Sequence, residues 1–152
     1  MLEVGNSIPD FSLLDDMGNT ITRETLLSYG KDIVLYAYPR DNTPGCTKEA
    51  CSFRDNFARL TALGAVVVGI SPDSPEKHAS FKAGHDLPFI LLSDPDKTLL
   101  TTLGSWGEKV LYGRTSLGVI RSTFIADRTG TIIKVWKKVI AAGHADKVAE
   151  FL

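Results

Sequence analysis

The sequence is poor in cysteine, with only Cys46 and Cys51 among its 152 residues. One pair is too few for the disulfide-rich scaffold of a small secreted protein, and a chain of this length can fold without a disulfide or a metal. No histidine lies near the pair in the sequence, which disfavours a zinc site. In a reducing compartment, two cysteines five positions apart are therefore more typical of redox chemistry than of a structural disulfide.

Long apolar runs and a strong net charge are also missing. No run approaches the roughly 18 residues of a membrane span. The 17 basic and 18 acidic residues give a net charge of -1, so no basic field points to nucleic acid or to anionic lipid. The first six residues lack the basic and apolar regions of a secretory signal. We therefore expect no nucleic-acid or membrane partner and a cytoplasmic location.

The chain shows no internal repeat, linker or low-complexity segment, and its length fits a single domain over residues 1–152. The apolar patterns predict strands at 11–14 and 20–22 (an N-terminal hairpin), 33–38, 65–70, 89–92, and 122–126 with 131–136 (a second hairpin). They predict helices at 46–63, 74–83, 96–103 and 145–152. Strands that alternate with helices and then end in a hairpin indicate an α/β domain with a central mixed sheet flanked by helices.

The segment from Pro39 to Cys51 is the most informative part of the sequence. It follows the buried strand 33–38 and opens the first long helix, and ligands gather at this end of strands in open α/β sheets. Thr43 and Pro44 suit the N-cap and the first helical position, which places Cys46 in the first turn. Free backbone N–H groups and the helix dipole stabilise a thiolate there.

The helical period places the two sulfurs on different faces. Cys46, Ala50 and Phe53 recur at spacings of three and four, which defines a buried face, whereas Cys51 lies beside Arg54 on a more polar face. The same pattern would also suit a small buried cysteine without chemistry, so the period alone leaves both readings of Cys46 open.

A family resemblance distinguishes between these readings. The pattern Pro39-x-x-x-Thr43-x-x-Cys46 resembles the peroxidatic motif of peroxiredoxins, and the string from Tyr38 to Thr47, with a second cysteine at Cys51, resembles their bacterioferritin-comigratory or Q-type subfamily. Segments 106–109, 113–114, 121–124 and 143–145 are also similar to that subfamily, so the likeness extends from Gly5 to Leu152. Ala37 and Arg40 depart from it, since an aromatic residue and a lysine are usual there.

The resemblance implies a thioredoxin-like fold and a role for each residue of the motif. Cys46 would be the peroxidatic nucleophile, and Cys51 would resolve its sulfenic acid as a Cys46–Cys51 disulfide. Thr43, Arg121 and the backbone N–H groups of Gly45 and Cys46 would bind the hydroperoxide, and Pro39 would shield the sulfur from water. Thioredoxin would be the reductant, no metal or organic cofactor would be needed, and the protein would be a monomer or a weak dimer.

Simple arithmetic shows why a low thiol pKa would not suffice for such an enzyme. A drop in pKa from ~8.5 to roughly 6 raises the thiolate fraction at pH 7 about 30-fold. The accompanying loss of nucleophilicity costs roughly tenfold, so the net gain is only about threefold. Most of the rate must therefore come from donors that orient the peroxide and stabilise charge on the departing oxygen, and Arg121 and Thr43 are of the right type.

Two other functions remain as alternatives. A thioredoxin-type disulfide oxidoreductase would use Cys-x-x-Cys, whereas four residues separate the cysteines here. A redox-sensing or holdase-like binding protein would use oxidation of Cys46 to switch a surface. The three histidines, His78, His85 and His144, show no metal spacing, and we expect them at the surface or in turns. We expect Trp106 and Trp136 to pack in the core. Arg114 is either a surface residue or a residue that assists the site.

Overall fold

The computed structural model describes residues 1–152, apart from the side chain of Leu111. Within that part, a sheet of order β2-β1-β5-β4-β3-β8-β9 forms the centre, and β6 and β7 form a separate ribbon. The strands are β1 Ser12–Asp15, β2 Thr20–Thr22, β3 Asp32–Ala37, β4 Ala65–Ser71, β5 Ile90–Ser93, β6 Trp106–Leu111, β7 Arg114–Val119, β8 Ser122–Ala126 and β9 Ile132–Trp136. The helices are α1 Arg23–Leu27, α2 Pro44–Asp55, α3 Phe57–Ala62, α4 Pro75–His85, α5 Thr98–Leu103 and α6 His144–Phe151.

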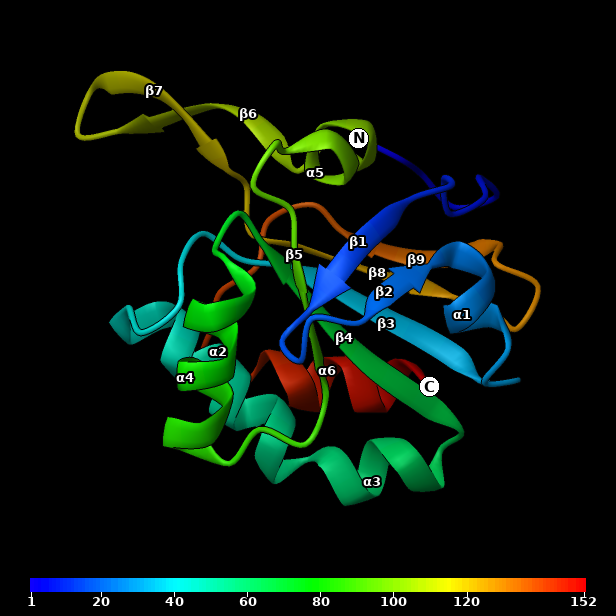
Figure 1. The fold of residues 1–152 in the computed structure, drawn as a ribbon. Coiled ribbons are helices and arrows are strands. Elements are labelled where there is room, and N and C mark those ends of the chain that lie inside the picture. The colour runs from blue at the N-terminus through cyan, green and yellow to red at the C-terminus, as the bar shows by residue number, and fades with distance from the viewer.

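The central sheet is mixed, as the element order predicts. Strands β3, β4 and β5 run parallel, whereas β8 pairs antiparallel with β3 and β1 pairs antiparallel with β5. Both expected hairpins are present, as the β1–β2 pair and the β8–β9 pair. Because β3 lies inside the sheet, the loop that follows it leaves from the middle of the molecule (Figure 1).

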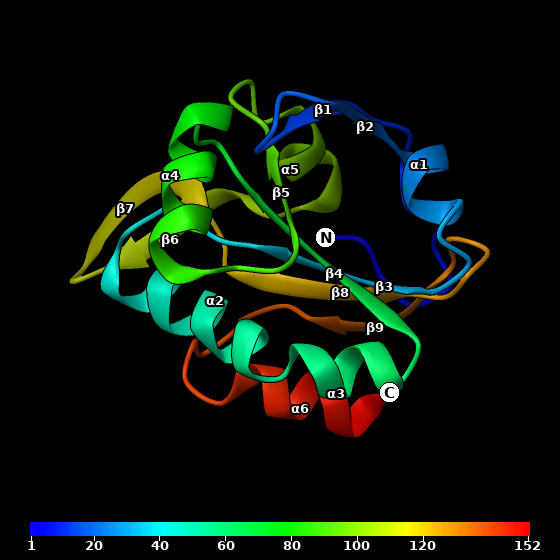
Figure 2. The ribbon, with the colours of Figure 1, turned by 60° about the horizontal axis from the view of Figure 1, so that its bottom comes forward.

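Strand β3 separates the two halves of the core. Val34 and Tyr36 face a cluster that α2, α3, α4 and α6 cover, whereas Ile33 and Leu35 face a second cluster under α1 and α5. Figure 2 shows α2, α3 and α6 together along one face of the sheet, with α1 and α5 on the other. Both faces of β3 are therefore buried, which explains why its sequence is a continuous apolar run instead of an alternating one.

The single helix expected over 46–63 is wrong in one respect, because it divides at Asn56 into α2 and α3. Its start at Pro44 agrees with the expected first helical position. The Asn56 side-chain amide donates to the carbonyl of Ser52 at 2.9 Å, and the backbone there leaves the helical region, with φ −100° and ψ 6°. The Asn56 N–H donates to the same carbonyl at 3.1 Å, so the side chain and the backbone of Asn56 together cap the end of α2.

The sequence analysis also missed helix α1 and the β6–β7 ribbon. Thr22 and Thr25 form a reciprocal capping box that starts the five-residue α1. Tyr112 and Gly113 both have positive φ, at 52° and 73°, which is the geometry of a two-residue hairpin turn. In Figure 1 this ribbon projects from the body of the fold beyond α5. Arg114 is exposed on it.

The expectation that the histidines lie at the surface is wrong for two of the three. His78 is a fully buried residue of α4, and His144 is 2% exposed at the start of α6. Both are satisfied by hydrogen bonds, His78 to Asp41 and the Leu92 carbonyl and His144 to the Thr123 hydroxyl. Among the described residues, no helix has the length and apolar character needed to cross a membrane.

Candidate active site

The loop after β3 ends in the N-terminus of α2, where Cys46 lies. Thr43 is the N-cap and Pro44 the first helical residue, as expected, and the Thr47 N–H makes the first intrahelical bond, to the Thr43 carbonyl at 2.9 Å. The N–H groups of Gly45 and Cys46 precede that bond, so the helix has no carbonyl to accept from them. Cys46 is 1% exposed, and its first-turn position places its sulfur beside these free donors.

Arg121 reaches the same place from a distant part of the chain. It directly precedes β8, whose Ser122 pairs with Ala37 at the end of β3, so its backbone lies at the sheet edge from which the Cys46 loop leaves. Its Nη2 donates to the Cys46 sulfur at 3.3 Å. A Cβ atom on Gly45 would lie 3.3 Å from the same nitrogen, so the glycine leaves room for the guanidinium.

Glu49 completes this arrangement, and the sequence analysis missed it. Its Oε1 accepts from Arg121 Nη1 at 2.6 Å, so one guanidinium bridges a carboxylate and the Cys46 sulfur. Glu49 is fully buried. The signal for it was present, because Glu49 follows Cys46 by three residues and precedes Phe53 by four, and a charged residue on a buried helical face needs a partner.

Burial dominates the electrostatics of Glu49. Loss of solvent raises the pKa of its carboxyl from the ordinary 4.5 to about 7, and the charge of Arg121 and its hydrogen bond offset part of that rise. Its second oxygen, Oε2, is buried and has no hydrogen-bond partner among the described residues. The Glu49–Arg121 pair thus changes its charge near neutral pH.

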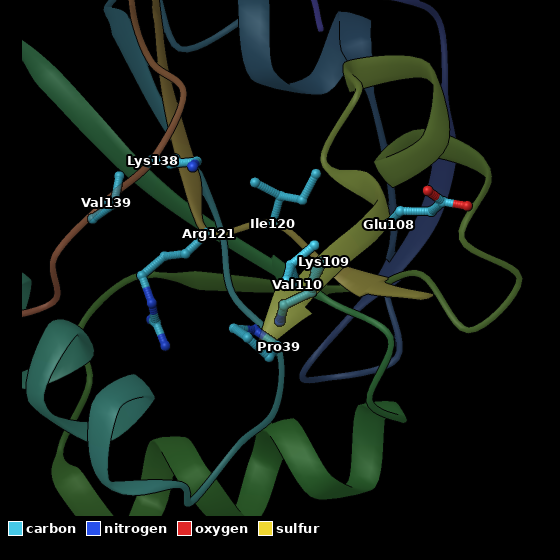
Figure 3. Close-up of a pocket in the computed structure, with 8 residues that line it drawn as sticks. All are labelled: Pro39, Glu108, Lys109, Val110, Ile120, Arg121, Lys138 and Val139. Atoms are coloured by element: carbon cyan, nitrogen blue, oxygen red, sulfur yellow. The ribbon is translucent and has the colours of Figure 1, made fainter. Parts of the chain in front are cut away.

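Thr43 and Pro39 line cavities beside the loop that leads to Cys46. The Thr43 hydroxyl donates to the Arg40 carbonyl at 2.9 Å, which leaves its oxygen lone pairs free to accept from a ligand. Pro39 lines two adjoining cavities. One, of about 530 Å³, also includes Arg121, Val110 and Lys109, and the other, of about 760 Å³, also includes Thr43 and Trp106. Figure 3 shows Pro39 and Arg121 in the first of these cavities, with Lys109 and Val110 of the projecting ribbon.

Cys51 lies in the same helix but in a different environment. It is half-buried, whereas Cys46 is enclosed, and both cysteines are free thiols. Helix α2 continues without interruption from Pro44 to Asp55, so both cysteines belong to one regular helix. The predicted difference between the two faces of this helix is therefore present.

Trp106 and Trp136 pack against the core, as expected. Trp106 contacts the cluster under α5, and Trp136 stacks edge-on against His144 with ring centroids 5.2 Å apart. Trp106 additionally lines the cavity that contains Thr43. Arg114 lines neither cavity beside Pro39.

An enclosed sulfur at a helix start, in contact with a guanidinium that itself lines a cavity, is suited to nucleophilic chemistry on a small polar substrate. On this fold it indicates a thiol-dependent peroxidase. The comparison with known proteins agrees with that class. The model of the AhpC/TSA family matches residues 4–135, and the chain belongs to this family of peroxiredoxins. The protein is therefore a peroxidase of the oxidoreductase class.

Individual relatives agree over nearly the whole chain. The peroxiredoxin Bcp of Bacillus subtilis is 45% identical over 152 residues, which covers 99% of this chain and 95% of the relative. The solved structure of Xylella fastidiosa PrxQ superposes with a TM-score of 0.90 at 31% identity, over 99% of this chain and 95% of that one. The Xanthomonas campestris bacterioferritin comigratory protein, described for its alkyl peroxide reduction activity, superposes with a TM-score of 0.85 at 35% identity, over 93% and 88% of the two chains. The thioredoxin-like fold and the Q-type resemblance are thereby confirmed.

Replacement of Glu49 by Gln should change how stability depends on pH. The folded-state pKa of Glu49 lies above its unfolded value, so between about pH 4.5 and 7 the native state holds a proton that the unfolded state releases. Stability from this group is therefore present at low pH and is lost as pH rises through that window, by up to about 3 kcal/mol. Urea denaturation of the reduced protein at several pH values should show that the free energy of unfolding of Glu49→Gln increases relative to that of the wild type as pH rises. A constant difference between the two proteins would contradict the raised pKa.

Proposed function

We propose that the protein reduces hydrogen peroxide and organic hydroperoxides with Cys46 as the nucleophile. The thiolate sulfur attacks the terminal peroxide oxygen, the O–O bond breaks, and Cys46 becomes a sulfenic acid. The remaining oxygen leaves with its electron pair and takes up a proton, which gives water or an alcohol. The observation that carries this proposal is the 3.3 Å contact between Arg121 Nη2 and the sulfur of an otherwise enclosed cysteine.

The donors around Cys46 are those that activation of a peroxide needs. Arg121 can hold the sulfur and one peroxide oxygen together, while the N–H groups of Gly45 and Cys46 can stabilise charge on the oxygens. The Thr43 oxygen can accept a hydrogen bond from the peroxide O–H, since its own O–H donates to the Arg40 carbonyl. Pro39 limits access of water to the sulfur from the cavity side. This division of roles supplies the rate that a low thiol pKa alone would not.

The cavity beside Arg121 supports organic hydroperoxides as substrates. Val110, Ile120 and Val139 give it apolar walls next to the guanidinium, so an alkyl group could lie there while the O–O bond reaches Cys46. The Xanthomonas relative is described for alkyl peroxide reduction, which agrees with this assignment. Hydrogen peroxide has no alkyl group and needs only the polar groups around Cys46.

Cys51 would complete the cycle. Its thiol attacks the Cys46 sulfenic acid, a Cys46–Cys51 disulfide forms and water leaves, and thioredoxin or a similar dithiol then reduces the disulfide. We propose no metal or organic cofactor, because the thiols carry all the electrons. All of these residues lie in the single domain 1–152, and we propose a monomer or weak dimer because both cysteines belong to one chain.

The disulfide requires helix α2 to unwind. Five helical residues advance roughly 7.5 Å and turn about 500°, which separates the two Cα atoms by roughly 8.6 Å. A disulfide tolerates no more than about 7 Å between Cα atoms. The helix containing both cysteines is regular in the reduced protein, so its first turns must melt after Cys46 is oxidised.

Replacement of Cys46 by Ser should abolish peroxide turnover and leave the fold intact, because a serine hydroxyl is not ionised near neutral pH. The measurement is peroxide consumption with thioredoxin, thioredoxin reductase and NADPH, using hydrogen peroxide and an organic hydroperoxide in parallel. Retention of about a tenth of the activity would place the nucleophile elsewhere. Insulin reduction without peroxide consumption by the wild type would favour a disulfide oxidoreductase, and neither activity would favour a binding protein.

Replacement of Arg121 by Ala should slow peroxide reduction about 100-fold or more, because a donor to the developing charge is lost. Reaction of Cys46 with iodoacetamide, a neutral alkylating agent, should slow far less. Both rates are measured by rapid mixing in the Cys51→Ser background, so that only Cys46 reacts. Equal slowing of the two reactions would mean that Arg121 acts only on the thiol and not on the peroxide.

Amide exchange should report melting of α2. Within residues 46–55, the amides from Thr47 onward should be protected in the reduced protein and exchange rapidly in the disulfide form, because the bond cannot form in an intact helix. The Cys51→Ser variant is the control: one equivalent of peroxide should oxidise Cys46 while protection persists, and excess peroxide should carry the sulfur to the sulfinic acid. Equal protection in the reduced and disulfide forms would refute the model.

A further inference from the structure

A buried polar network lies behind the Cys46 loop and has no part in the chemistry described above. The carboxylate of Asp41 accepts from the Tyr38 hydroxyl at Oδ1, at 2.6 Å, and lies 2.6 Å from His78 Nδ1 at Oδ2. His78 is fully buried and its Nε2 lies 2.9 Å from the carbonyl of Leu92, on β5. The network therefore joins the loop after β3 to helix α4 and to strand β5.

Both ring nitrogens of His78 are engaged. The Leu92 carbonyl can only accept, so Nε2 carries a proton and donates it. A second proton is shared between Nδ1 and Asp41 Oδ2, which makes this a charge-assisted contact in an enclosed site. The backbone of Asp41 is held as well, since its N–H donates to Asp73 Oδ2 at 2.7 Å.

The hydrogen-bonded residues Tyr38, Asp41 and His78, called the clamp below, hold the loop in place and do not form a metal site. Asp41, Asp73 and His78 do place possible ligand atoms within 4.8 Å of one another. A metal would need a free imidazole nitrogen, yet one nitrogen is bound to a carbonyl and the other to the carboxylate. Asp73 Oδ2 already accepts from the Ser71 hydroxyl and from the Asp41 N–H.

The clamp acts on the segment that presents the peroxide-binding groups. Asn42, next to Asp41, has the left-handed φ of 61°, a conformation that asparagine adopts more readily than most residues, and the chain turns there toward α2. Thr43 follows, and its carbonyl and hydroxyl set the start of α2 through Thr47 and the Arg40 carbonyl. A fixed Asp41 thus fixes the path of the chain into the first turn that contains Cys46.

We propose that His78 is a positioning residue that acts through Asp41, holding residues 39–45 in the form that binds peroxide and opposing the melting that the disulfide requires. This inference rests on the proposed function. It requires that loosening the clamp change two rates in opposite directions, because peroxide reduction needs the ordered loop and disulfide formation needs the melted one. A residue that only stabilised the fold would not produce this opposite pair of changes.

Two isosteric replacements of His78 test the route through Asp41. Asparagine places an N–H donor near the position of Nδ1, toward Asp41, whereas glutamine places one near that of Nε2, toward the Leu92 carbonyl. His78→Gln should slow the reaction of Cys46 with hydrogen peroxide by roughly tenfold and speed disulfide formation by a similar factor, as expected for the loss of one charge-assisted hydrogen bond. His78→Asn should keep both rates within about threefold of the wild type.

The rates of sulfenic acid formation and of disulfide formation are measured separately, in the Cys51→Ser variant and in the protein with both cysteines. Rapid mixing with hydrogen peroxide in Cys51→Ser gives the rate of sulfenic acid formation, and iodoacetamide in the same background should react at an unchanged or higher rate. The wild-type background gives the rate of the following disulfide step. Equal rates for His78→Gln and His78→Asn, or a fall in both steps together, would overturn the proposal.

Two further variants keep the test decisive. Tyr38→Phe removes only the hydroxyl that donates to Asp41, so it should show the same opposite pair of changes even where the His78 variants do not fold. Asp127→Ala is the matched control, since it removes a carboxylate that accepts hydrogen bonds from Thr129 and Thr131 in the turn after β8, at the other end of the sheet. It should change neither rate. A wild type that does not consume peroxide would refute the proposed function. An active wild type whose two rates are unchanged in Tyr38→Phe and in the His78 variants would refute the clamp alone.

Discussion

The bridge that the Arg121 guanidinium makes between Glu49 and the Cys46 sulfur is the constraint on which the site depends. Its two contacts, 2.6 Å and 3.3 Å long, fix a positive charge beside an enclosed sulfur. The antiparallel register of β8 on β3 brings Arg121 there, and the bare backbone of Gly45 leaves it room. A slip of one residue in that register would turn Arg121 to the other face of the sheet.

In the proposed cycle, helix α2 is ordered for one step and melted for the next. Its later part is well anchored, because Phe53 is fully buried and stacks on Tyr36 with ring centroids 4.6 Å apart. Its first turns depend instead on the Asp41 loop and on Arg121. Local opening is far easier than global unfolding, so the proposed melting can stay near the cysteines while the rest of the core remains closed.

Apolar runs and turn residues predicted most of the helices and strands. The predictions failed where an apolar pattern and a local turn or cap signal disagreed. The buried strands and both hairpins of the central sheet follow from apolar runs and turn residues. The single helix expected over 46–63 overlooked the break at Asn56, where the backbone leaves the helical region and the side chain caps α2. The β6–β7 ribbon was missed because its apolar residues, among them Val110 and Leu117, do not alternate regularly with polar ones, although the turn at Tyr112 and Gly113 could have indicated it.

The sequence by itself determined the position of Cys46 in the first turn of a helix, the spacing to Cys51 and the resemblance to peroxiredoxins, because all three are features of neighbouring residues. Only the tertiary structure placed Arg121 on the sulfur, 75 positions away, and revealed the burial of Glu49 and His78. Helical periodicity says which residues share a face, but not what that face meets. Sheet register and the packing of α4 and β8 against the loop decide those partners, and burial then sets the charge balance at the site.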